Sequence, residues 1–208
     1  MATKQYLMPA GNPTVLDRIK NQQNWELYHY QTYAQAGQNQ LTFFTAAPGT
    51  LKADKYNMQV AGALPAGYSF VVQEILVDFK SGATPSTFGT QAAGDYVNDT
   101  LKVYNSGRLD FRVSDSTVTQ GAPLKRFPMD VRMDGFAAAA DTTTAAAAKQ
   151  TLVNYSAFVG RVYRVADALI GASQNFKVDL YWDTAVVPVS VAGEIGIIMR
   201  GVLGRLVT

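Results

Sequence analysis

One residue of the chain is suited to acid–base catalysis at neutral pH, the single histidine His29. It lies in the segment WELYHYQTY, residues 25–33, with tyrosines around it. A histidine in such a setting is expected to pack or to form a hydrogen bond. The chain has no cysteine, which excludes a cysteine nucleophile, and no Gly-x-Ser-x-Gly elbow that would present a serine nucleophile. A Ser-His-Asp arrangement would have to use His29. The sequence therefore predicts a protein that is not an enzyme.

Metal and phosphate chemistry also lack a motif. With one histidine and no cysteine, a metal site would have to be built from carboxylates, and the aspartates do not follow the spacing of a calcium loop. The glycine-containing stretch AGALPAG, residues 61–67, lacks the Lys-Ser/Thr of a phosphate-binding loop. We expect no cofactor. The scattered aspartates are Asp95, Asp99, Asp110, Asp115, Asp130, Asp134 and Asp141.

Composition narrows the remaining classes. The 208 residues are 48% hydrophobic and 16% charged, which is low against a typical share of about 25% and is typical of a surface partly covered by neighbours. The net charge is +2 without a basic cluster, so phosphate-backbone binding through charge is not expected. The N-terminus lacks the apolar core of a signal peptide, and no apolar run reaches about 20 residues. These features predict a soluble protein made in the cytoplasm.

The elements that would position any site begin with an N-terminal arm, residues 1–40. Residues 15–28 are expected to form a short helix, and aromatic residues follow in a polar background. Because free disordered tails are poor in aromatic residues, we expect this arm to lie on a neighbour. Deletion of residues 1–36 is then expected to leave a folded domain that fails to assemble.

From Leu41 onward, alternating apolar and polar residues separated by turn residues predict strands. Two segments are expected to be loops, residues 81–95 and the alanine- and threonine-rich residues 136–149. The expected strands are 41–46, 68–80, two short strands within 100–113, 127–133, 152–165, 176–183 and 192–208. The segment 127–133 contains Pro128, which indicates an edge or irregular strand.

This tally predicts an all-β fold, a single eight-stranded jelly-roll sandwich over residues 41–208 with an extended arm and long loops. An immunoglobulin-like sandwich is the alternative. Its usual length is about 100 residues, so the arm and the long loops would then need another explanation.

The chain distributes residues typical of interfaces instead of concentrating catalytic ones. Tyrosine, methionine and arginine amid few charges are typical of buried contact surfaces. Four dispersed arginines, Arg161, Arg164, Arg200 and Arg205, are expected to pair with carboxylates across subunits in preference to nucleic acid or lipid head groups. The candidate subunit-interface residues are Trp25, Tyr28, Tyr30, Tyr33, Gln38, Gln40, Arg161, Arg164, Arg200 and Arg205.

Several stretches resemble jelly-roll major capsid proteins of tailless icosahedral bacteriophages. They are YAQAGQNQLTFFTAAPGT (33–50), YNMQVAGALPAGYSFVVQEILVDF (56–79), YNSGRLDFRVSDS (104–116), APLKRFPMDVR (122–132) and IIMRGVLGRLV (197–207). The resemblance implies a structural virion protein that self-assembles into capsomers and a shell, and it offers no catalytic residues. Its expected partners are other copies of the chain, minor capsid proteins, and an internal membrane or the genome. Many relatives carry two jelly rolls in one chain, so the capsomer stoichiometry stays open.

Three other classes remain at this point. A minor virion component such as a spike, penton or tail part shares the same composition. A carbohydrate-binding β-sandwich module would stack sugars on exposed aromatic residues. A hydrolase would require His29 or a carboxylate pair in a cleft.

Overall fold

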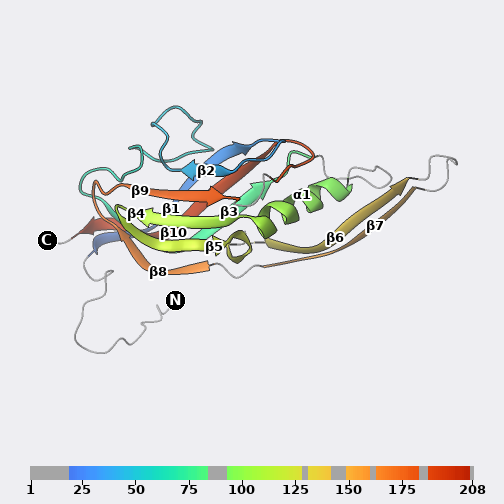
Figure 1. Ribbon diagram of the computed structural model, residues 1–208. Coiled ribbons are helices and arrows are strands. Elements are labelled where there is room, and N and C mark those ends of the chain that lie inside the picture. The colour runs from blue at the N-terminus through green and yellow to red at the C-terminus, as the bar shows by residue number, and fades with distance from the viewer. Residues whose placement is uncertain are drawn as a thin grey trace.

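The described part of the chain is mostly β and contains two antiparallel four-stranded sheets, as expected for an all-β sandwich (Figure 1). The structure is a computed structural model. Residues 19–83, 93–127, 131–141, 149–159, 163–182 and 187–206 are described.

The first sheet, sheet A, has the strand order β1-β10-β3-β8. Its strands are β1 (Ile19–Tyr33), β10 (Gly193–Leu206), β3 (Ser69–Lys80) and β8 (Tyr163–Ile170). The N-terminal and C-terminal strands of the described chain are therefore neighbours, paired along nearly their full length. Register shifts interrupt both pairings around β3, one beside Arg200 and one beside Glu74.

The second sheet, sheet B, has the strand order β2-β9-β4-β5. It is formed by β2 (Gln40–Phe43), β9 (Phe176–Tyr181), β4 (Arg108–Val113) and β5 (Ser116–Pro123). The short helix η2 (Leu124–Arg126) follows β5. Because β1, β3, β8 and β10 lie in one sheet and β2 and β9 in the other, the chain crosses repeatedly between the two layers.

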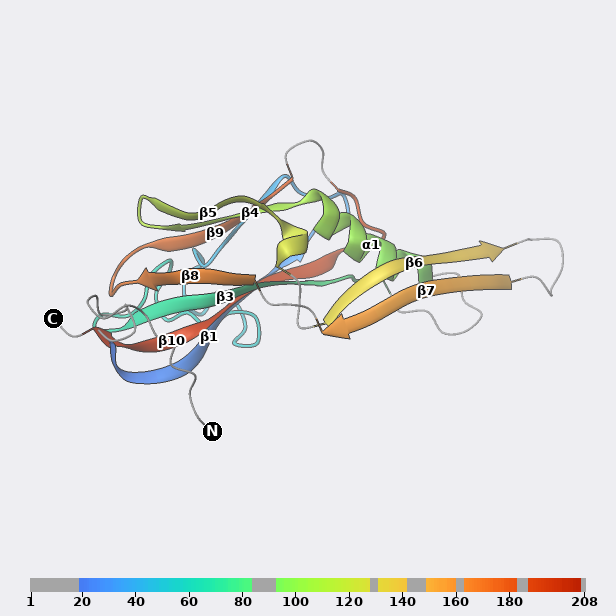
Figure 2. The same cartoon turned by 90° about the horizontal axis from the view of Figure 1, so that it is seen from below.

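A long hairpin leaves this sandwich. It consists of β6 (Val131–Asp141) and β7 (Lys149–Val159), which pair with each other from Val131↔Val159 to Asp141↔Lys149. Among the described residues neither strand pairs with a third. Helix α1 (Ala93–Ser106) lies beside β6, and Figures 1 and 2 show the hairpin extending past the end of the sandwich.

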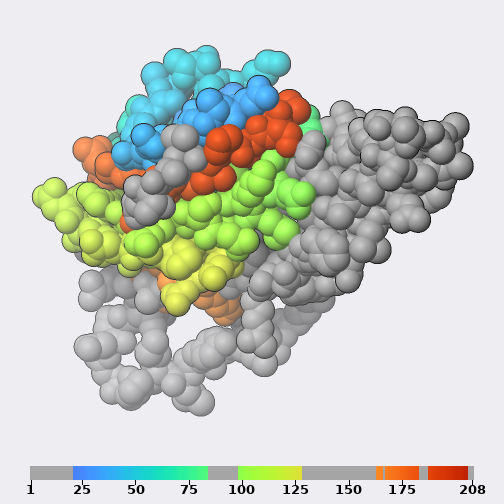
Figure 3. All heavy atoms as spheres, turned by 45° about the vertical axis from the view of Figure 1, so that its right-hand side comes forward, coloured from blue at the N-terminus to red at the C-terminus, as the bar shows by residue number. Residues whose placement is uncertain are grey.

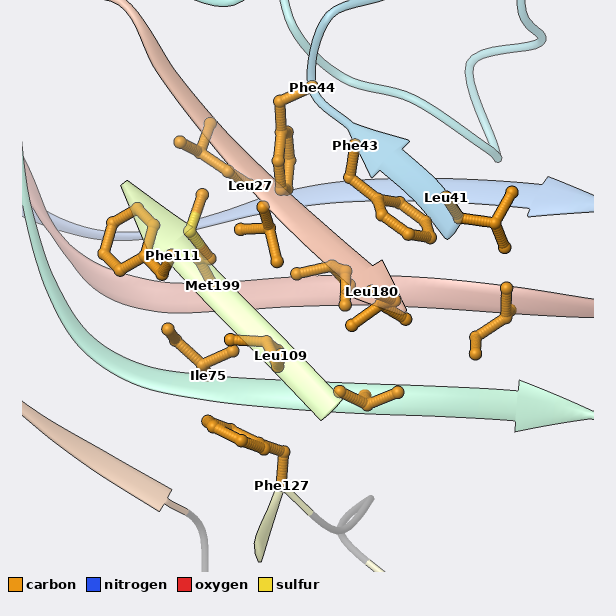
Figure 4. Packing of buried hydrophobic residues seen from close by; sticks show 14 of the residues in the cluster. Leu27, Leu41, Phe43, Phe44, Ile75, Leu109, Phe111, Phe127, Leu180 and Met199 are labelled. Atoms are coloured by element: carbon orange, nitrogen blue, oxygen red, sulfur yellow. The ribbon is translucent and has the colours of Figure 1, made fainter. Parts of the chain in front are cut away.

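The core lies between the two sheets, as Figure 4 shows. Sheet A contributes Leu27, Ile75 and Met199, and sheet B contributes Phe111 and Leu180; all five are buried. Successive side chains of a strand point to opposite faces, so the alternating apolar residues of each strand meet in one layer. This is the period-two signal that predicted most of the strands.

The loop between β2 and β3 closes the open edge of sheet A beside β1 (Figure 3). Tyr30 donates its backbone N–H to the Lys55 carbonyl at 2.7 Å, and the Tyr28 N–H is bound by Asn57 Oδ1 at 3.0 Å. An isolated bridge joins His29 to Tyr56. The loop thus satisfies backbone groups that an edge strand would otherwise expose.

The structure corrects the prediction for the arm. From Ile19 to Tyr33 the segment expected as helix and arm is strand β1, a full member of sheet A. Leu27, His29 and Tyr33 are buried on one face of the strand. The alternation was obscured because His29 and Gln31 are polar residues on that face, while Tyr28 and Tyr30 are aromatic residues on the other. The start of the expected arm, residues 1–18, lies outside the described residues.

Three other local predictions were wrong. Residues 93–106 are a helix, whereas residues 100–106 were expected to form the first of two short strands and the turn after it. Asp99, Thr100 and Val103 are buried at helical spacing, and Tyr104 packs onto the core. The expected loop 136–149 contains the end of β6 and the start of β7. The expected single strand 152–165 corresponds to β7, which ends at Val159, and β8, which starts at Tyr163.

Candidate assembly surface

Four charged residues form one row across the outer face of sheet A. The register pairs Glu26 of β1 with Arg200 of β10, Arg200 with Glu74 of β3, and Glu74 with Arg164 of β8. The row therefore reads acidic, basic, acidic, basic across all four strands. With strands about 4.8 Å apart, it is about 14 Å wide.

Two ion pairs hold this row within the chain. Arg200 Nε donates to Glu26 Oε1 at 2.6 Å, and Arg164 Nε lies 3.6 Å from Glu74 Oε1. The Arg164 side chain is 74% exposed and the Glu74 side chain only 23%. Exposed pairs of this kind contribute only about 0–1 kcal/mol to stability, so the fold does not require them.

An open hollow of about 710 Å³ lies over the same face. Three members of the row line it, together with the amide side chains of Asn24, Asn57 and Gln73. Trp25 borders this hollow and also a second one of about 220 Å³ lined by Leu27, Met58 and Leu203 among others. At 44% exposure, Trp25 offers a large apolar contact to any partner.

The wall of the hollow is fixed by the loop between β2 and β3. Tyr28 donates its hydroxyl to the Ala53 carbonyl at 2.7 Å. Asn57 Nδ2 donates to the Glu26 carbonyl at 2.7 Å, while its Oδ1 accepts the Tyr28 N–H. These bonds hold the loop and β1 together, so the hollow is preformed.

A second polar cluster lies further along the same sheet. Tyr30 donates its hydroxyl to Asp78 Oδ2 at 3.0 Å, and Lys80 Nζ lies 3.7 Å from the same oxygen. Gly196 lies between these strands in the register, and a Cβ there would meet the Tyr30 ring at 2.3 Å. Burial, and then the neighbouring Asp78 carboxylate, raise the pKa of Tyr30 well above its ordinary value. The tyrosine therefore stays protonated and keeps donating to Asp78.

The structure brings together several predicted interface residues. Trp25, Tyr28 and Arg200 line the large hollow, Arg164 completes the charged row, and Tyr30 lies on the same sheet. The acidic members Glu26 and Glu74 were missed. The sequence shows them only as single acidic residues, and the register alone shows which charges are neighbours.

The other predicted residues lie elsewhere. Tyr33 is fully buried and donates its hydroxyl to the Val187 carbonyl at 2.8 Å, and burial raises its pKa to about 12. Gln38 lies between β1 and β2, and Gln40 Nε2 donates to Asp179 Oδ1 at 3.3 Å on sheet B. Arg205 lies 5.6 Å from the centroid of the Tyr68 ring.

Arg161 belongs to the same predicted set but falls outside the described residues.

His29 has a structural role, as its sequence setting predicted. It is 1% exposed, and its Nδ1 accepts the backbone N–H of Phe44 at 2.7 Å. The imidazole contacts the rings of Phe43, Phe44 and Tyr56. Burial lowers the pKa of His29 from 6.5 to about 4, so the ring is neutral at physiological pH and Nδ1 remains an acceptor.

Two aspartates face each other on the outer side of sheet B. Asp110 and Asp179 are paired in register between β4 and β9, and both are buried. Asp179 accepts from Thr42 at 2.7 Å and lies 2.9 Å from Lys177 Nζ; Asp110 accepts the Gly121 N–H at 2.6 Å. Burial tends to raise the pKa of Asp179, but bonds from Thr42 and Lys177 outweigh it and leave the pKa lowered. Each carboxylate thus has its own partners.

In the described part of the chain, no group of three or more His, Cys, Asp or Glu residues is arranged to hold a metal ion. None of the described helices has the length and apolar character to cross a membrane. Comparison of the chain with protein-family models, curated proteins and solved structures finds no match.

Proposed function

We propose that the sandwich is a jelly roll and that the chain is a structural protein of a virus particle. The observation that carries the proposal is the strand order of the two sheets, β1-β10-β3-β8 and β2-β9-β4-β5. A jelly roll has eight strands in two packed sheets joined by Greek-key connections and occurs in viral capsid and lectin domains, and the eight strands and repeated crossings of this chain support that assignment. The hairpin β6–β7 is then an insertion between two of these strands.

The assembly role is supported by surfaces that a lone domain does not need. Sheet A has a row of alternating charges and a hollow beside an exposed tryptophan. The hairpin adds two strands of 11 residues that pair with no third strand among the described residues, so their outer edges are open to a further strand, although helix α1 lies beside β6. Contacts with neighbouring copies supply a reason for both features, and the sequence resemblance to capsid proteins points the same way.

In this proposal the partners are other copies of the chain, with minor capsid proteins, an internal membrane or the genome as further contacts, and the location is the virion. The catalytic role is assigned to no residue. The buried His29, with Nδ1 bound to Phe44, has a role in the fold already.

The test measures the mass and shape of the purified protein at rising concentration. Light scattering gives the mass, and negative-stain microscopy gives the shape. We expect rings, capsomers or shells. A matched variant replaces residues 131–159 with a short Gly-Ser linker and should retain the sandwich, judged by circular dichroism, while losing the larger assemblies.

A stable monomer at every concentration would contradict the proposal. Glycan screening would then test the lectin class, with Trp25→Ala as the variant expected to abolish sugar binding. Saturable binding of a sugar by a monomer would establish that class in place of the capsid role.

A further inference from the structure

The order of charges across sheet A is self-complementary. From β1 to β8 the row reads Glu26, Arg200, Glu74, Arg164. Read in the opposite direction it is basic, acidic, basic, acidic. A second copy presenting the reversed row therefore offers the opposite charge at each of the four positions.

Only one kind of two-fold pairing reverses the row. If two copies of sheet A face each other about an axis parallel to the strands, β1 faces β8 of the second copy and β10 faces its β3. Glu26 then faces Arg164, and Arg200 faces Glu74. An axis along the row would instead place each residue opposite itself, which would bring like charges together. A two-fold interface uses the same patch on both subunits, so this complementarity specifies its orientation.

The shape of the surface agrees with this arrangement. Glu26, Glu74 and Arg200 line the hollow of about 710 Å³, whereas Arg164 is not among its lining residues and its side chain is 74% exposed. An exposed arginine can therefore enter the hollow of the facing copy beside Glu26. Arg164 contacts Glu74 through Nε at 3.6 Å, and a guanidinium carries five N–H donors for further partners.

We propose that two copies of this chain pair face to face through sheet A, about a two-fold axis parallel to its strands. The pairing rests on the proposed function, because it names one contact through which the copies associate. Facing Glu26–Arg164 and Arg200–Glu74 contacts set its orientation.

Charge exchange separates contacts between copies from contacts within one chain. In the double variant Glu26→Arg/Arg200→Glu the first intrachain ion pair is inverted and the second is untouched. Its row reads basic, acidic, acidic, basic, so each position faces its own sign in the pair. In the double variant Glu74→Arg/Arg164→Glu the row reads acidic, basic, basic, acidic, so like charges again face each other in the pair. When the two variants are mixed, a copy of one facing a copy of the other has opposite charges at all four positions.

The measurement is sedimentation velocity on the full chain, for each variant alone and for an equimolar mixture, with thermal melts to verify folding. We expect each variant alone to associate at least about tenfold more weakly than the wild-type chain, since like charges that face each other in an interface repel. The mixture is expected to form the pair again.

A third variant controls for lost stability. Glu26→Arg/Arg164→Glu breaks both intrachain pairs yet keeps opposite charges facing each other between copies. It is expected to melt at or below the temperatures of the other two variants and still to pair. If pairing followed thermal stability instead of facing charge, the inference would be overturned.

The outcomes distinguish the two proposals. Shells that form equally well with every variant would overturn the two-fold pairing and leave the capsid role standing. A charge-dependent pair that never grows larger would support the pairing and overturn the capsid role. A wild-type chain that stays monomeric would overturn both.

Discussion

At the residue scale, His29 and Phe44 show how a polar group is used inside the core. Phe44 has a positive φ of 71°, and its N–H donates to His29 Nδ1. This conformation is uncommon outside glycine, so the end of β2 depends on partners that hold it. The neutral imidazole is such a partner, and protonation of Nδ1 would remove it.

The pH dependence of stability follows from the lowered pKa of His29. The folded pKa is about 4 and the ordinary value is 6.5, so between these values the unfolded chain binds more protons. The contribution of neutral His29 to the free energy of unfolding is complete above pH 6.5. It is lost as the pH falls toward 4, by an amount on the order of 3 kcal/mol. Urea unfolding at several pH values between 7.5 and 4 measures this loss.

Asparagine is the matched control for His29, because its Oδ1 can accept the Phe44 N–H without titrating. We expect His29→Asn to show a shallower decline of unfolding free energy over the same pH interval. An equally steep decline in the variant would assign the acid sensitivity to other groups.

Gly196 and Tyr30 provide a second residue-scale prediction. A methyl group at position 196 would meet the Tyr30 ring at 2.3 Å and displace it from Asp78. We expect Gly196→Ala to lower the free energy of unfolding by about 1–3 kcal/mol, the usual cost of overpacking. Chemical denaturation of the variant measures the effect.

The control for this contact is a double-mutant cycle with Tyr30→Ala. Once the ring is absent, Gly196→Ala is expected to cost clearly less than in the wild-type background. Additive costs in the cycle would show that the glycine is required for another reason.

At the element scale, β1 is the strand that sequence patterning assigned to an arm. It pairs with β10 from Ile19↔Leu206 to Tyr33↔Gly193 and adds Leu27, His29 and Tyr33 to the core. The outer face of the strand carries Glu26, Tyr28, Tyr30 and Thr32, which are exposed or half-buried. A polar-looking segment was therefore a structural part of the sheet.

This strand changes the expected result of N-terminal truncation. Removal of residues 1–36 deletes β1 and exposes β10 as an edge, so we expect an unfolded or insoluble product instead of a folded domain. Removal of residues 1–18 retains every described element and should leave a folded protein. Circular dichroism and thermal melts of both truncations provide the comparison; a folded product lacking residues 1–36 would contradict the role of β1.

At the scale of the whole molecule, the charged face of sheet A makes association sensitive to salt. Raising the ionic strength from 0.1 to 1 M shortens the Debye length from about 10 to about 3 Å, which weakens attraction between exposed charges. We expect the association constant to fall with added sodium chloride, as measured by sedimentation. Association that strengthens with salt would indicate an apolar contact, with Trp25 as the first residue to substitute.

Much of the sheet content was predictable because period-two patterning reflects burial of one face. Residues 68–80 and 176–183 were expected as strands and contain β3 and β9, and the expected strand 41–46 overlaps β2, which begins one residue earlier and ends at Phe43. Helix α1 was missed because threonine and asparagine weaken its local propensity, while packing of Val103 and Tyr104 stabilises it. Tertiary contacts overrode the local preference there.

By itself, the sequence determined that the chain is mostly β, that it lacks cysteine and carries one histidine, and that aromatic and arginine residues are spread through it. These properties depend on composition and on local alternation. Only the tertiary structure decided that β1 lies beside β10, that Glu26, Arg200, Glu74 and Arg164 form one row, and that β6 and β7 form a hairpin. Strand order and register depend on contacts between residues far apart in the chain, and the local pattern of a strand carries no information about its neighbour.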